Sequence, residues 1–186
     1  SVAIGFAFRD ILQNFLAGRI ILLGRPFSEG DWIRYGDFEG NVTDISTRST
    51  WMRTFDGRDV TIPNAELFTN PVTIMTRSPM IRSDYEFGVS YAADIDKAIG
   101  TILAAIKSVE AVSEEQPPDA GVSDLAGSSV NIKARWWTKT GDAYGAKLAV
   151  MKAVKQALDE AEIEIPFPQR DINLSRDVVR ELKRAS

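Results

Sequence analysis

The sequence predicts an α+β chain in which an apolar helix precedes a five-stranded β domain and a second, α+β domain. Three observations predict it. Residues 2–23 carry apolar side chains at helical spacing, residues 27–76 hold short β-prone runs between tight turns, and residues 84–165 alternate strand and helix patterns. A chain of 186 residues is long enough for two small domains.

Composition excludes several classes of function. The chain contains no Cys and no His, which rules out disulfides, thiol nucleophiles, His general bases and Cys/His metal sites. Its net charge of -4 is unfavourable for non-specific binding to nucleic acid, which depends on Lys and Arg neutralising phosphates. We therefore expect no catalytic site, no metal, no cofactor and no nucleic-acid partner.

The first helix has two interpretations. It is either an amphipathic helix that packs on its own domain, or a helix that enters a membrane at residues 2–8 and then lies along the surface. No apolar run approaches the roughly 20 residues that span a bilayer, and the start lacks the features of a signal peptide. We expect the helix to continue upstream of residue 1 and to end at Gly24-Arg25-Pro26. Its apolar positions are Phe8, Ile11, Leu12, Phe15, Leu16 and Ile20.

The β domain is predicted from five short runs and their turns. Asp56-Gly57 between two β-prone runs is a strong hairpin signal. Gly40 within a run indicates a bulge or a close backbone approach. Five short strands with tight turns are typical of a small Sm-like barrel. The strands are expected at 32–35, 39–45, 49–55, 58–62 and 72–75.

After a linker at 77–83, the pattern is β-α-β-β-α, which suits a ferredoxin-like sandwich. Strands are expected at 84–90, 122–125 and 129–138, with helices at 94–109, capped by Asp94, and 141–162. An extended segment with two prolines and a charged tail at 175–186 follow. The apolar faces are predicted as Ile95, Ala98, Ile99, Ile102 and Ile106 on the first helix, Tyr144, Leu148, Met151, Val154 and Leu158 on the second, and Val130, Ile132, Ala134 and Trp136 on the last strand.

Charged residues near the hairpin suggest structure rather than catalysis. Asp56, Asp59 and Glu66 fit turn and cap chemistry. Basic residues beside aromatic ones could bind RNA, as Sm-like barrels often do, but cation–π stacking or an ion pair between subunits explains them equally well. These residues are Arg48, Arg53 and Arg58, beside Trp51 and Phe55.

The motifs and their order resemble the mechanosensitive channel of small conductance family over residues 2–174. The apolar stretch from Gly5 to Gly18 is similar to the family's last transmembrane helix. The other matching motifs are Arg25-Pro26-Phe27, Gly30-Asp31, Gly40-Asn41-Val42, the hairpin from Arg53-Thr54 to Pro63-Asn64, Gly127 to Asn131, Gly141-Asp142 and Pro166-Phe167-Pro168-Gln169.

The resemblance implies a homoheptamer in a bacterial inner membrane. Val2 and Phe6 would form the hydrophobic pore seal, and the helix would kink near Asp10 and bend at Gly18, with residues 11–23 against the middle domain. The implied parts are a pore and interfacial helix at 1–23, the Sm-like domain at 24–76, the linker at 77–83, the ferredoxin-like domain at 84–165, a strand at 166–174 that forms a parallel barrel between subunits, and the tail at 175–186. That barrel would use Gln169, Arg170, Asp171, Ile172 and Asn173.

The implied function is passive flow of ions and small osmolytes under membrane tension, which protects the cell against osmotic stress. Membrane lipids would be partners, residues 24–186 would be cytoplasmic, and further transmembrane helices would lie upstream. Two residues depart from the family pattern: Phe6 is bulkier than the usual Leu, and Arg19 is charged where the family is usually apolar. The alternatives are a ligand- or partner-sensing module of a related channel and a soluble Sm-like RNA-binding protein.

Overall fold

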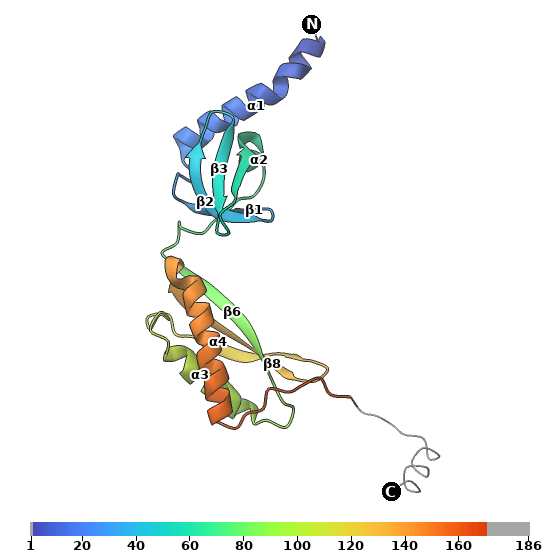
Figure 1. The fold of residues 1–186 in the computed structure, drawn as a ribbon, viewed down its shortest axis with the longest axis vertical. Helices are drawn as coiled ribbons and strands as arrows, with labels where there is room; N and C mark the ends of the chain where they lie inside the picture. Colours follow the sequence, from blue (N-terminus) through green and yellow to red (C-terminus); the bar gives the residue numbers. More distant parts are fainter. Residues whose placement is uncertain (1, 171–186) are drawn as a thin grey trace, which may run out of the picture. The chain divides into compact units, whose positions relative to one another are not determined.

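A computed structural model describes residues 2–170, with side chains from Phe8 onward (Figure 1). The chain divides between Ile81 and Arg82 into two compact units, here called the N-terminal and C-terminal units. Among the described residues, no helix combines the length and the apolar character needed to cross a membrane.

The N-terminal unit joins a long helix to a five-stranded antiparallel sheet with strand order β4-β3-β2-β1-β5. All five predicted strands are confirmed, each boundary within one residue. A short helix, α2, was not predicted, because six residues are too few to show a helical period. The elements are α1 Val2–Gly24, β1 Trp32–Tyr35, β2 Phe38–Ile45, β3 Ser49–Thr54, β4 Asp59–Pro63, α2 Asn64–Thr69 and β5 Thr73–Ile74.

The turns of this sheet follow from its glycines. Gly57 adopts a φ of 87°, and the hairpin closes through a 2.8 Å hydrogen bond from Thr54 N to Arg58 O. The predicted close approach at Gly40 is also confirmed, since a Cβ there would lie 2.7 Å from Thr54 Cα. The bulge lies further along β2, where the register shifts between Val42 and Asp44.

Strands β1 to β4 each bury residues on one face, which gives the unit a small apolar core. Alternation along β3 buries Thr50 and Met52 and exposes Trp51 and Arg53. The core comprises Ile21, Phe27, Ile33, Val42, Ile45, Met52, Ile62 and Leu67.

The C-terminal unit has the predicted β-α-β-β-α order and a three-stranded sheet with order β6-β8-β7. Two strands begin earlier than predicted. Residues 80–83 of the predicted linker already belong to β6, because none of these four residues is Gly or Pro, and β7 takes in residues 119–121. The elements are β6 Met80–Val89, α3 Ile95–Lys107, β7 Asp119–Leu125, β8 Val130–Lys139, the 3-10 turn η1 Thr140–Asp142 and α4 Ala143–Glu160.

Helices α3 and α4 share one apolar core with the inner face of β8. Asp94 caps α3 as predicted, accepting a hydrogen bond from Lys97 N. The predicted inner face of β8 is buried throughout, and the α3 face also packs into this core. Its fully buried members include Val89, Ala98, Ile102, Ile106, Ile132, Ala134, Trp136, Val150, Val154 and Leu158.

The predicted apolar face of α4 was partly wrong. Tyr144 and Leu148 are exposed, by 76% and 51%, and Met151 is half-buried. The buried face of α4 is rotated from the predicted one and includes small side chains, which let the helix lie close to its neighbours. It consists of Ala143, Ala146, Val150, Val154 and Leu158.

Candidate functional site

Helix α1 contacts the rest of the N-terminal unit through a narrow stripe of four residues, of which three are small or polar and one, Ile21, is a large apolar residue. Ala17 and Ile21 are buried, Gly18 is buried between them, and Asn14 is half-buried. These four positions follow the i, i+3, i+4, i+7 spacing of one helical face. We call this stripe, Asn14, Ala17, Gly18 and Ile21, the docking stripe.

Gly18 marks the closest approach of α1 to the rest of the unit. A Cβ at this position would lie 2.5 Å from Asn64 Nδ2 and closer still to Thr47 O. Neither atom moves freely, because Thr47 O belongs to the backbone and Asn64 is completely buried. Glycine is therefore required here by packing, independently of any effect on helix stiffness.

Asn64 is held in place by three hydrogen bonds. Its Oδ1 accepts from Thr50 Oγ1 at 2.8 Å, its Nδ2 donates to Ser46 O at 2.9 Å, and its backbone N donates to Arg48 O at 3.0 Å. A buried amide with partners for both ends is rigid, because leaving either unpaired would cost about 1–3 kcal/mol. The surface on which Gly18 rests is thus fixed by the β sheet.

Asn14 links α1 directly to the start of α2. Pro63 precedes α2 and provides no side-chain cap, so the first N–H groups of the helix need other acceptors. Asn14 Oδ1 accepts from Ala65 N at 2.9 Å, while Asn14 Nδ2 donates to Asp10 O within α1 at 2.9 Å. Asn14, 51 positions earlier in the chain, therefore takes the role of the N-cap residue of α2.

Helix α1 ends where the sequence predicts. Arg25 adopts a left-handed φ of 44°, and its N donates to Ile21 O at 2.8 Å. Pro26 then stops the helix and Phe27 enters the core. Beside this turn lies an open pocket of about 290 Å³, lined by Ile21, Leu22, Arg25, Phe27, Ser28, Glu29 and Ile45.

From Phe8 onward, the large apolar residues of α1 other than Ile21 point away from the rest of the unit. The apolar positions predicted for its amphipathic face are 40% to 57% exposed, so the packing interpretation fails for that face. Arg19, whose partner the sequence did not reveal, stacks its guanidinium 5.6 Å from the centre of the Phe15 ring. The exposed apolar residues of α1 are Phe8, Ile11, Leu12, Phe15, Leu16, Ile20, Leu22 and Leu23, which we call the outer face.

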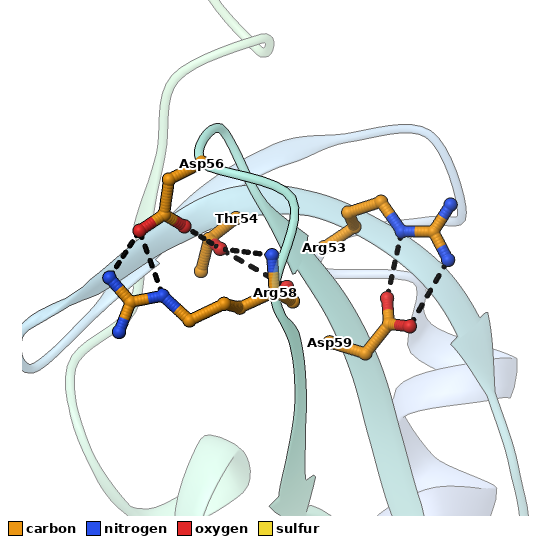
Figure 2. A network of polar contacts seen from close by, with 5 residues as sticks. All are labelled: Arg53, Thr54, Asp56, Arg58 and Asp59. Atoms are coloured by element: carbon orange, nitrogen blue, oxygen red, sulfur yellow. Dashed lines mark hydrogen bonds and ion pairs between the residues drawn. The ribbon is translucent and has the colours of Figure 1, made fainter.

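The β3–β4 hairpin carries two exposed ion pairs (Figure 2). Arg53 holds Asp59 through hydrogen bonds of 2.8 and 3.1 Å, and Asp56 binds both Arg58 and Thr54 Oγ1. The hydrogen bonds from Arg58, and secondarily from Thr54, lower the pKa of Asp56. The hydrogen bonds from Arg53 lower the pKa of Asp59 in the same way.

These pairs change the interpretation of the basic residues on the hairpin. Arg53 lies on the outward face with Trp51, as predicted, but its ion-pair partner belongs to its own chain. Phe55 packs edge-on against Trp32, with ring centres 5.2 Å apart. The predicted turn role is confirmed for Asp56, whereas Asp59 begins β4 and bonds across the strands to Arg53, and Glu66 accepts a 2.8 Å hydrogen bond from the Tyr35 hydroxyl on β1.

The other predicted site residues are placed only in part. Val2 and Phe6 lie in the first turns of α1, but their side chains fall outside the description. Helix α1 continues without interruption through Asp10 and Gly18. Gln169 and Arg170 lie at the end of the described chain, beyond which fall Asp171, Ile172 and Asn173. Within residues 2–170, no cluster of three or more acidic side chains could hold a metal ion.

Sequence reasoning missed the docking stripe, although a signal existed. Ala17-Gly18 is a pair of small residues, and Asn14 is a polar residue one turn before it. Small side chains at helical spacing indicate close packing between backbones. The larger apolar residues of α1 dominated the pattern, which hid the stripe.

Two family models match the chain. The model described as "Mechanosensitive ion channel, beta-domain" covers residues 10–76, and the one described as "Mechanosensitive ion channel MscS, C-terminal" covers residues 84–165. The chain is 36% identical over 175 residues to an uncharacterized MscS family protein of Buchnera aphidicola subsp. Baizongia pistaciae, covering 94% of this chain and 62% of the relative. It is 32% identical over 180 residues to the small-conductance mechanosensitive channel of Edwardsiella ictaluri, covering 95% and 62%.

A solved structure agrees with these relatives. The crystal structure of Helicobacter pylori MscS in a closed state matches with a TM-score of 0.90 at 30% identity, covering 94% of this chain and 70% of that chain. The chain spans about three fifths of the length of the curated relatives it matches first. Two family models, relatives of 30% identity and above and a close structural match together establish that the chain belongs to the MscS family, whose members are mechanosensitive channels and not enzymes.

Proposed function

We propose that the protein is a mechanosensitive channel that passes ions and small solutes when membrane tension rises and so protects the cell against hypoosmotic shock. The described chain would supply the end of the pore helix and the cytoplasmic domains. Family membership supports this proposal, and one structural observation carries it. Helix α1 docks through small and polar residues and leaves its outer face exposed.

The outer face needs a partner. Eight large apolar residues on one exposed helix would be unfavourable in water, and patches of this kind mark contacts with membranes or proteins. In the proposed channel, membrane lipids and copies of the same helix cover this face. The relatives named as small-conductance mechanosensitive channels support membrane placement. We assign the inner membrane and a homoheptamer, with residues 24–186 in the cytoplasm, by analogy with the family.

The proposed domain parts follow the same analogy. The five strands of the sheet β4-β3-β2-β1-β5 support an Sm-like barrel, and the β-α-β-β-α order of the C-terminal unit supports a ferredoxin-like sandwich. The proposed barrel strand and tail are those predicted, 166–174 and 175–186, whereas the linker is limited to residues 77–79, because residues 80–83 belong to β6. The barrel strand of each subunit would meet its neighbours at the far end of a hollow cage.

Val2 and Phe6 remain the proposed seal. A ring of large apolar side chains offers water no hydrogen bonds, so a narrow pore lined by them excludes ions by drying. Asp10 and Gly18 are the proposed hinge positions. The contact of Gly18 with Asn64 and Thr47 gives this hinge a physical basis, because bending there changes how α1 rests on the β sheet.

Patch recording of the full-length protein in liposomes tests the proposal. We expect a conductance that opens as suction increases, and Phe6→Ser should lower the threshold because a hydroxyl at each subunit helps water to enter the seal. Phe8→Ser is the matched control, since Phe8 is an exposed aromatic of the same helix that lies outside the proposed seal. A protein without a tension-gated conductance would contradict the function. Lower assembly yield with an unchanged threshold in Phe6→Ser would contradict the seal alone.

No observation favours the alternatives. The ion pairs that engage Arg53 and Arg58 leave fewer free cations for RNA on the hairpin. A sensing module of a related channel would share the fold, and the same recordings would distinguish it, because such a module would not conduct by itself.

A further inference from the structure

The segment that leaves α4 is held in a defined path along the C-terminal unit. Glu162 adopts a left-handed φ of 58°, and Ile163 N donates to Leu158 O at 2.9 Å, which reverses the chain after the helix. Lys97 on α3 adds a 2.9 Å hydrogen bond from its Nζ to Ala161 O. Ile163 then enters the core.

Two further hydrogen bonds continue this path. Ser90 N donates to Glu164 O at 3.0 Å. Five residues later, Gln169 N donates to the side-chain Oγ of Ser128 at 3.0 Å, across 41 positions of sequence. Among the described residues, this is the one hydrogen bond that joins residues 165–170 to another part of the chain.

The prolines explain why this one bond matters. Pro166 and Pro168 have no N–H, so the segment has few donors with which to attach itself. Their fixed φ angles keep the chain extended, and an extended stretch of five residues spans roughly 16 Å. Without a tie at Gln169, the end of the segment would be free to swing about Glu164.

Ser128 is itself well placed to be a fixed point. It lies in the turn between β7 and β8, which closes through a 2.9 Å hydrogen bond from Ala126 N to Ser129 O. Tyr91 clamps the same turn from the end of β6, donating its hydroxyl to Ala126 O at 2.5 Å. Movement of the turn away from the unit would therefore break the hydrogen bond from Tyr91.

We propose that Ser128 is a positioning residue that fixes where the chain leaves the C-terminal unit at Gln169–Arg170, and that this alignment brings the exit segments of neighbouring copies together. The second copy of this chain is the partner, so the inference rests on the assembly named under the proposed function. Phe167, which lies between the two prolines and is 81% exposed, is the large apolar side chain that this segment offers to a neighbouring copy.

Hydrogen exchange and native mass spectrometry of the full-length protein test the inference. Ser128→Ala should accelerate exchange of the Gln169 amide about 2- to 13-fold, the range for loss of one ordinary hydrogen bond of 0.5–1.5 kcal/mol, and the assembly should dissociate at a lower temperature. Ser128→Thr, which keeps the hydroxyl, should restore both. Ser123→Ala is the matched control, because Ser123 bonds to Asn131 O on the same hairpin and does not touch the exit segment.

The outcomes separate the inference from the function on which it rests. An unchanged rate of amide exchange in Ser128→Ala would show that the hydrogen bond from Gln169 to Ser128 does not hold the exit segment. Faster exchange with an unchanged dissociation temperature would overturn the role of Ser128 in assembly. A dissociation temperature that falls equally in Ser123→Ala would overturn it too. A wild-type protein that does not assemble would contradict the proposed function before any substitution is made, and with it the assembly role.

Discussion

Helices α1 and α3 both carry large apolar residues, but they direct most of them to opposite sides, α3 toward its own core and α1 away from it. In α3 the large apolar residues face the core, and Ile102 and Ile106 are completely buried. In α1 the core-facing positions other than Ile21 are small or polar, and Leu16 is 57% exposed. The difference shows that an apolar stripe marks the side of a helix that avoids water, and that this side need not face the helix's own domain.

The comparison predicts unequal costs for equal truncations. Ile102→Ala should destabilise the protein by about 2–5 kcal/mol, because it leaves a cavity in a closed core. Leu16→Ala should change the stability of the dissociated chain by less than about 0.5 kcal/mol, as for most exposed substitutions. Urea unfolding of the chain in mild detergent measures both. Similar losses for the two variants would mean that the outer face is packed within the chain.

The glycines of the two helices should respond in opposite directions. Gly18→Ala should destabilise the N-terminal unit by about 1–3 kcal/mol, because the new Cβ would overlap Thr47 O and Asn64. Gly100→Ala in α3 is the control, since nothing lies within 4 Å of its Cβ position and alanine favours a helix by about 1 kcal/mol. Thermal unfolding should show a lower midpoint for the first and a higher one for the second. If Gly18→Ala raised the midpoint of thermal unfolding, the close contact of α1 with the β sheet at Gly18 would not determine how the helix packs.

A smaller effect should appear at acid pH in the hairpin of the N-terminal unit. The pKa values of Asp56 and Asp59 are lowered by their Arg partners, so each carboxyl binds its proton at lower pH in the folded than in the unfolded state. Their stabilisation is complete above about pH 4, the unfolded value, and is lost as pH falls through the lowered folded value. Asp59→Asn should reduce the drop in urea midpoint between pH 5 and pH 2. The same drop in wild type and variant would show that the Arg53 pair contributes nothing, as many surface pairs do.

Sequence reasoning succeeded where local signals and burial agree. Asp56-Gly57 predicts its hairpin and Asp94 its helix cap, because turn and cap preferences are local. The inner face of β8 follows from simple alternation. In each of these cases the neighbours in sequence are enough to determine the structure.

Sequence reasoning failed where contacts between distant residues decide. The cap of α2 comes from Asn14, a residue 51 positions earlier. The buried face of α4 follows small alanines that pattern analysis ranks below Tyr144 and Leu148. Short sequence windows contain neither the partner of Asn14 nor the space available beside α4, so both required the structure.

Paired cysteine labelling tests the central claim, that α1 docks through its small and polar stripe and keeps its outer face for partners. The described chain has no cysteine of its own, so Leu16→Cys and Ile21→Cys can each be introduced as a single thiol within it. In the detergent-dissociated chain, Leu16→Cys should react rapidly with a water-soluble maleimide, and Ile21→Cys slowly, because Ile21 is only 1% exposed. In the full-length protein in liposomes, both should be protected. Equal reactivity of the two thiols in the dissociated chain, or an unprotected Leu16→Cys in the membrane, would contradict the account.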